Sequence, residues 1–184
     1  MDKVLGIGNA LVDIMTRLKD DQFLERHDLP KGSMQLVDQE YVKTLTEATR
    51  EMDKQQSSGG SAANTIHGLA RLGAETGFIG KVGNDELGNF FLKDMEQAGI
   101  KPQLFRSPTD SGRAIAMVTP DSERTFATFL GAAVELSADD LQQQLFEGYR
   151  YLHLEGYLIQ NHELMKKAFE LAKANGMLIS LDLA

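Results

Sequence analysis

The segment GGSAAN, residues 59–64, combines residue types that could hold a polar ligand at the start of a helix. Its two glycines, Gly59 and Gly60, let the backbone approach a ligand closely. Free N–H groups at a helix start favour polar or anionic ligands, and Asn64 offers both a donor and an acceptor. A flexible loop followed by a serine N-cap explains the same residues, so the segment by itself leaves both interpretations open.

A second candidate follows the apolar run 4–7, which predicts a buried strand that ends in Gly8 and Asn9. Polar residues at the end of a strand in a parallel sheet lie where α/β folds build ligand sites. Asp13 lies between two apolar residues, where a buried carboxylate requires partners such as ligand hydroxyls. A turn asparagine and an exposed aspartate on an edge strand are the alternative, and the local sequence does not choose between the two.

Three further positions carry weaker signals. Arg124 begins an expected strand and could bind a phosphate with two hydrogen bonds, although a surface charge is the simpler interpretation. The glycine-rich turn at residues 80–88 is best explained by Asp85 capping a helix. His153 and Glu155 share one face of an expected strand, where such a histidine is more often a core residue than a catalyst.

The elements that position these residues predict an α/β fold with a largely parallel sheet, because strands and helices alternate from residue 76 onward. A hairpin interrupts this rhythm, with strands at 113–118 and 124–130. Short strands at 11–17 and 34–37 also break it. We expect these four segments to form a separate small sheet that covers one end of the molecule.

The other elements follow from apolar periodicity and capping residues. We expect strands at 76–82, 149–155 and 177–183, and helices at 22–27, 39–52, 62–72, 86–98, 138–147 and 162–175. Residues 53–58 are polar and predict an irregular stretch. The final strand is apolar and has no covering helix after it, which predicts that the chain is a fragment of a larger domain.

Composition narrows the class of protein. Lys and Arg number 19 against 27 Asp and Glu, and a net charge of −8 argues against nucleic-acid binding. The chain has no cysteine, and its four histidines lack the HxxxH spacing of a zinc site, so we expect no disulfide, no thiolate metal site and no catalytic metal held by imidazoles. No signal peptide and no membrane-spanning segment is evident in the sequence, so a cytoplasmic location is expected.

The order of the motifs is more specific than any one of them. GNALVDI, GGSAANTIHGLARLG and GFIGKVGNDELG, followed by SGRAIAMVTPDSERTFATFLGAA and YLHLEGYLI, resemble the N-terminal half of the ribokinase, or PfkB, family of carbohydrate kinases. The resemblance extends over residues 1–184 and is strongest to the adenosine-kinase-like branch. It implies a three-layer α/β domain with a small β-sheet lid, and an ATP-dependent transfer of phosphate to a primary hydroxyl of a nucleoside or sugar.

The resemblance also implies roles for individual residues. Asn9 and Asp13 would bind substrate hydroxyls, while Gly59, Gly60 and Asn64 would line the same pocket. Arg124 would lie near the transferred phosphate. Lid sheets of many members form dimers, so a homodimer through the lid is expected.

The resemblance implies one absence as well. Members carry the catalytic base in a G-A-G-D motif of the C-terminal half, where ATP and Mg²⁺ also mainly bind, and the motif does not occur in residues 1–184. We therefore expect no catalytic base and no kinase activity in this chain alone. The rival interpretations are a non-catalytic sugar- or nucleoside-binding module and, more distantly, an NAD-dependent oxidoreductase, which the missing G-x-G-x-x-G disfavours.

Overall fold

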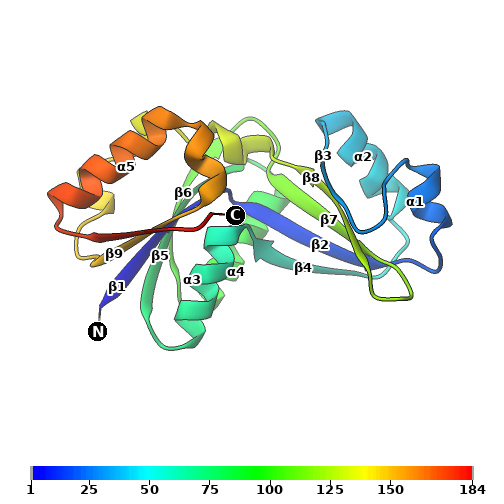
Figure 1. Cartoon of the computed structure of the whole chain (residues 1–184), viewed down its shortest axis with the longest axis horizontal. Helices are drawn as coiled ribbons and strands as arrows, with labels where there is room; N and C mark the ends of the chain where they lie inside the picture. The colour runs from blue at the N-terminus through cyan, green and yellow to red at the C-terminus, as the bar shows by residue number, and fades with distance from the viewer. Residues whose placement is uncertain (1, 184) are drawn as a thin grey trace.

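The computed structural model describes residues 2–183 and has two lobes, each built on a five-stranded sheet (Figure 1). The first sheet is entirely parallel. Its strands, in spatial order, are β10 (Leu178–Leu181), β9 (Tyr151–Leu154), β1 (Lys3–Ile7), β5 (Glu75–Gly83) and β6 (Lys101–Ser107).

The second sheet is mixed. Its strands, in spatial order, are β3 (Met34–Leu36), β8 (Arg124–Phe129), β7 (Gly112–Val118), β2 (Leu11–Arg17) and β4 (Lys54–Gly59). The hairpin β7–β8 is antiparallel, as the sequence predicts, and β2 pairs with β7 in parallel and with β4 in antiparallel orientation. All four short strands expected in a separate sheet lie here.

Five α-helices in the described residues, 2–183, cover the two sheets. They are α1 (Gln22–Arg26), α2 (Gln39–Ala48), α3 (Ser61–Arg71), α4 (Glu86–Gln97) and α5 (His162–Ala174). Capping side chains fix three of the starts, since Asp38, Asp85 and Asn161 each accept a hydrogen bond from a backbone N–H in the first turn. The cap that the sequence predicts at Asp85 is among them.

The first lobe has three layers. On one face of its sheet, α3 and α4 contribute Ile66 and Phe91 to a core that includes Phe78 of β5. On the other face, α5 packs its apolar side against Leu152 and Leu154 of β9. The expected three-layer α/β architecture with a parallel sheet is therefore confirmed.

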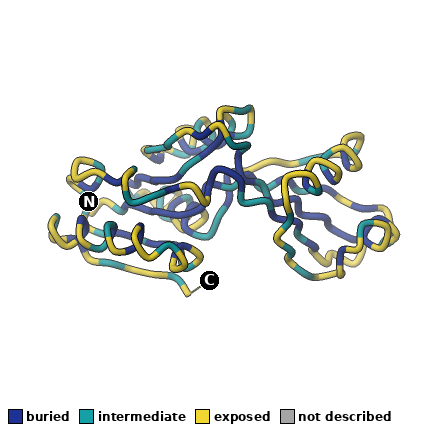
Figure 2. The backbone as a smooth tube through the Cα atoms, turned by 90° about the horizontal axis from the view of Figure 1, so that it is seen from above, coloured by how far each residue is buried: buried dark blue, intermediate teal, exposed yellow. Residues whose placement is uncertain are grey.

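The second sheet has one covered and one open face. Helices α1 and α2 bury their apolar side chains against Ile115 and Met117 of β7. The backbone where the two lobes meet is largely buried (Figure 2). There Ile14 of β2 pairs with Ile115 and so points to that same side, and Val12 and Ile14 pack into the core formed with α4. The open face therefore carries the alternate residues of β2, among them Asp13.

Two sequence predictions about elements are wrong, and one strand is missed. Residues 53–58, expected to be irregular, form most of β4, because pairing with β2 satisfies the backbone of a polar segment. The expected helix at 138–147 is two short 3₁₀ turns, Ala138–Asp140 and Gln143–Leu145. Strand β6 was not predicted, since its burial along one edge of the sheet gives no clear alternation.

Within residues 2–183 no helix has the length and apolar character needed to cross a membrane.

Candidate functional site

Three strands of the first sheet end side by side and place polar residues at one edge. Ile7 of β1 pairs with Leu154 of β9, which pairs with Leu181 of β10. Adjacent strands are about 4.8 Å apart, so the residues that follow these three, Gly8–Asn9, Glu155 and Asp182, form a row at the carboxyl ends. This edge faces the start of α3 and the base of the second sheet (Figure 1).

Glu155 is the centre of this row and is fully buried. Its Oε1 accepts a hydrogen bond from Nδ2 of Asn9 at 2.6 Å, and its Oε2 accepts one from the backbone N–H of Ala62 at 3.2 Å. Burial raises the pKa of Glu155, and these two donors oppose the shift. The carboxylate therefore ties the end of β1 to the first turn of α3.

Asp182 makes a second connection in the same row. Its Oδ2 accepts a hydrogen bond from the Ser61 hydroxyl at 2.5 Å, and its Oδ1 accepts one from the backbone N–H of Gly156 at 2.6 Å. Gly60 connects these contacts to β4 with a φ of +100°, and a Cβ there would lie 2.2 Å from the carbonyl oxygen of Asn9. Glycine is therefore required at position 60 by both backbone conformation and space.

Asn9 carries an unpaired acceptor. Because its Nδ2 donates to Glu155, its Oδ1 points away from Glu155, and this buried oxygen has no hydrogen-bond partner within residues 2–183. A buried acceptor without a donor is unfavourable unless a ligand or water supplies one.

An apolar cavity of about 600 Å³ opens beside Asn9, and we call it the junction cavity. Asn9, Gly60 and Glu155 line its polar end. Large apolar side chains are usually covered, yet four of those that line this cavity are more than half exposed. They are Met34, Leu36, Val134 and Tyr157.

Asp13 lies two residues beyond Leu11 on the open face of the second sheet, next to the junction cavity. Burial alone raises its pKa to about 6, and no hydrogen bond reaches its carboxylate within residues 2–183. A Cβ at Gly59 would lie 2.4 Å from that carboxylate, so glycine at position 59 makes room for it.

A second cavity of about 420 Å³, the sheet-face cavity, adjoins Asp13. Asn64 of α3 and Arg124 of β8 also line it, with Phe126 between them and the junction cavity on the same sheet face. The structure therefore places Asn9 and Gly60 in one cavity and Asp13, Asn64 and Arg124 in the next. Gly59 lines neither cavity but borders Asp13.

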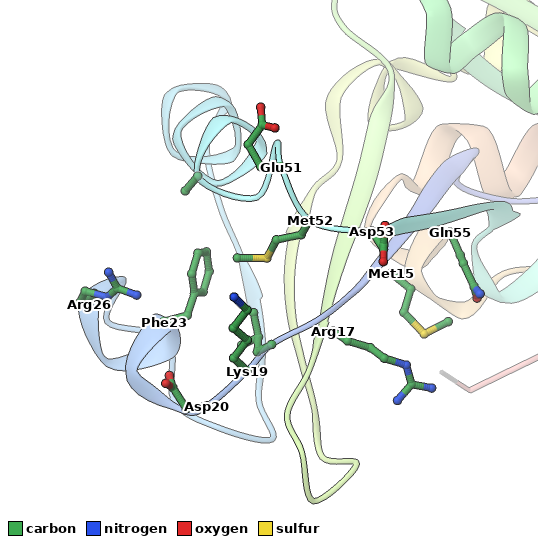
Figure 3. A pocket seen from close by; sticks show the side chains of 12 residues that line it. Met15, Arg17, Lys19, Asp20, Phe23, Arg26, Glu51, Met52, Asp53 and Gln55 are labelled. Atoms are coloured by element: carbon green, nitrogen blue, oxygen red, sulfur yellow. The ribbon is translucent and has the colours of Figure 1, made fainter.

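The distal cavity, about 720 Å³, lies at the far end of the second sheet (Figure 3). Charged side chains of both signs surround Phe23 and Met52: Arg17, Lys19, Asp20, Arg26, Glu51 and Asp53. None of the six residues expected to form the site lines this cavity.

Within residues 2–183 no group of three or more His, Asp or Glu side chains could hold a metal ion.

Glu155 is a residue of the site to which the sequence analysis gives no role, since it notes only that Glu155 shares a strand face with His153. The signal was present, since Glu155 follows a buried strand in the same way that Asn9 does. Its distant partners, Asn9 and Ala62, could not be paired with it without the fold.

Comparisons with known proteins agree with this architecture. The sequence model described as pfkB family carbohydrate kinase matches residues 33–183. The chain is 23% identical to adenosine kinase 2 of Arabidopsis thaliana over 98% of the chain and 54% of that protein. The chain spans about half the length of the curated relatives it matches.

Two solved structures are similar in sequence and fold. The adenosine kinase of Sinorhizobium meliloti is 34% identical, with a TM-score of 0.84 over 98% of this chain and 56% of that chain. A probable sugar kinase of Rhizobium etli CFN 42 is 33% identical, with a TM-score of 0.85 over 98% of this chain and 55% of that chain.

Proposed function

Because this chain belongs to the pfkB family of carbohydrate kinases, we propose that it forms the substrate-binding part of an ATP-dependent kinase that phosphorylates a primary hydroxyl of a nucleoside or sugar. The observation that carries the proposal is a pair of acceptors without donors. Oδ1 of Asn9 is buried and unpaired within residues 2–183, and the carboxylate of Asp13 is largely buried without a hydrogen bond there. Hydroxyl groups of a ribose-like ring supply the missing donors.

The junction cavity favours a nucleoside over a free sugar. A sugar alone would leave its apolar walls, including Leu36 and Tyr157, exposed to water. A flat base beside the ribose would cover them, and the favourable burial is about 25 cal/mol per Å². The curated relatives named as adenosine kinases and as guanosine-inosine kinase agree with this choice.

The primary hydroxyl that receives the phosphate would lie at the sheet-face cavity. Arg124 is exposed at the start of β8, and its guanidinium can donate hydrogen bonds to two oxygens of a phosphate. Asn64 lines the same cavity from α3. We propose that the second sheet acts as a lid that excludes water when substrate is bound. A homodimer formed through this sheet stays a prediction, to be checked by sedimentation.

The catalytic base, ATP and Mg²⁺ are assigned to residues outside this chain. The relatives are about twice as long, and no G-A-G-D motif occurs in the 184 residues. We therefore expect these residues alone to bind substrate without transferring phosphate. Positioning of the γ-phosphate, on which phosphoryl transfer depends, would come from the other half of the protein.

Calorimetric titration of the 184-residue chain with adenosine, inosine, guanosine and ribose tests the proposal. Nucleosides should bind at least tenfold more tightly than ribose, and ADP release with ATP and Mg²⁺ should stay at the background rate. Equal affinity for ribose would indicate that the substrate is a sugar and not a nucleoside. Measured turnover would show that the catalytic residues lie in this chain after all. Binding without turnover by the full-length product of the gene would favour the non-catalytic binding module.

A further inference from the structure

Three polar side chains from different elements meet behind the Gly59–Gly60 turn. Ser58 is the residue of β4 just before the turn, His67 lies on α3 and Asp94 lies on α4. The Ser58 hydroxyl is 2.5 Å from Oδ2 of Asp94 and 2.6 Å from Nε2 of His67. The backbone N–H of Ser58 also donates to Oδ2 of Asp94, at 2.9 Å.

The donors and acceptors of this cluster fix its proton positions. Asp94 can only accept, so the single proton of the Ser58 hydroxyl points to Asp94. The hydroxyl oxygen must then accept from His67, which requires the proton of the neutral ring on Nε2. Burial lowers the pKa of His67, while Asp94 opposes that shift, and the Nε2–H contact is the same in the neutral and charged rings.

The arrangement is unsuited to nucleophilic catalysis. Ser58 is buried, and the carboxylate contacts the same hydroxyl as the histidine instead of the opposite ring nitrogen. None of the three residues lines the junction cavity or the sheet-face cavity.

The position of the cluster gives it a different use. Ser58 is adjacent to Gly59, whose backbone borders the Asp13 carboxylate, and the next residue, Gly60, begins the turn into α3. Asp94 accepts hydrogen bonds from two donors of Ser58, so it fixes the end of β4, which lies at the edge of its sheet in the part of the chain that the structure describes. Charged hydrogen bonds of this kind are the stronger ones in proteins.

We infer that Asp94 and His67 are positioning residues, which hold Ser58 and thereby set the geometry of the Gly59–Gly60 turn against Asp13. They act through Ser58 and do not touch the substrate. The effect on substrate affinity rests on the function proposed above, whereas the effect on the turn itself does not. The inference therefore needs one measurement with a ligand and one without.

The first measurement is adenosine binding by three variants. Asp94→Ala should weaken binding about tenfold, which is the loss expected when a charged hydrogen-bond partner is removed. Asp94→Asn should retain most of the affinity, because the amide oxygen can accept from both donors of Ser58. Glu96→Ala, an exposed carboxylate two residues along α4, is the matched control and should bind as the unchanged chain does.

The second measurement is amide hydrogen exchange without ligand. Asp94→Ala should raise the exchange rates at residues 58–61 at least tenfold more than elsewhere in the chain. In the unchanged chain, nitrogen NMR at pH 7 should find the proton of His67 on Nε2. Exchange that rises uniformly, or a neutral His67 ring whose proton lies on Nδ1 and not on Nε2, would overturn the inference. Absence of adenosine binding by the unchanged chain would count against the proposed function alone, because the exchange result still decides this inference.

Discussion

Two carboxylates at the junction of the lobes, Glu155 fully buried and Asp13 half-buried, have opposite surroundings. Glu155, at the end of β9, accepts hydrogen bonds from Asn9 and from the backbone of Ala62. Asp13, on the open face of β2, accepts none within residues 2–183. Burial raises the pKa of both groups, yet only Glu155 has donors that favour its charged form.

The difference separates a structural carboxylate from a ligand-binding one. A buried charge that has all of its partners holds segments together, whereas a buried charge without partners is kept at the expense of stability. Unfavourable groups of this second kind concentrate at functional sites. The region around Glu155 should therefore respond to mutation with a loss of folding, and the region around Asp13 with a loss of binding.

The largest expected effect is that of Glu155→Ala. The substitution leaves Nδ2 of Asn9 and the N–H of Ala62 buried without acceptors, and it opens a cavity. We expect the free energy of unfolding in urea to fall by about 3 kcal/mol.

Glu170→Ala is the matched control for Glu155→Ala, because Glu170 is an exposed glutamate on α5. Its effect should stay within about 0.5 kcal/mol. A similar small change for Glu155→Ala would mean that Glu155 does not hold β1 to α3, and the contrast with Asp13 would disappear.

Asp13→Asn should have the opposite pattern, with weaker binding and greater stability. The native pKa of about 6 lies above the reference value of 3.8, so the native state holds this proton more tightly than the unfolded state. Stability from this group is therefore present at low pH and is lost as pH rises from about 4 to about 6. At pH 7 the charged group destabilises the fold, and its neutral isostere should raise the unfolding free energy by about 1–2 kcal/mol after allowance for solvent access.

Nucleoside affinity should fall roughly 10- to 100-fold in the same variant, since hydroxyl donors lose a charged acceptor. Calorimetric titration with adenosine, beside urea unfolding, measures both effects. Asp139→Asn, at an exposed aspartate, should change neither. Unchanged adenosine affinity in Asp13→Asn would show that Asp13 does not bind the substrate.

The same contrast explains how far the sequence could predict this molecule. Strands with regular apolar patterns, such as β5, and helices with capping residues, such as α4, were predicted because their information is local. Strand β4 was missed because its residues are polar and become a strand only by pairing with β2. Edge strands of this kind are specified by their neighbour, which is distant in the sequence.

Site residues divide along the same line. Asn9 could be proposed because it follows the end of a strand, and Asp13 because burying a carboxylate is unfavourable without partners. Glu155 receives no role from the sequence, because its partner Asn9 lies 146 residues away and no local pattern connects the two. The contact of Asp94 with Ser58 spans 36 residues and two lobes, and only the fold reveals it.

The smallest expected effect is a pH dependence of binding that Asp13 alone should produce. If only the carboxylate accepts substrate hydroxyls, a pKa of about 6 makes binding weaken as pH falls through 6. Between pH 7.5 and 5.5 the apparent dissociation constant for adenosine should rise about fourfold, whereas an unshifted aspartate would change it by only a few per cent. Calorimetric titration at four pH values measures this change.

Asp13→Asn is the control, because a side chain that cannot titrate should give a flat profile in its weaker binding. A fourfold change that persists in Asp13→Asn would assign the titration to another group, with Glu155 the first candidate since its pKa is also raised by burial. In that case the charge of Glu155 would affect ligand binding as well as folding, and the two carboxylates would not have separate roles. A flat profile in both proteins would mean that Asp13 stays charged throughout this pH range, so that solvent or ligand compensates its burial.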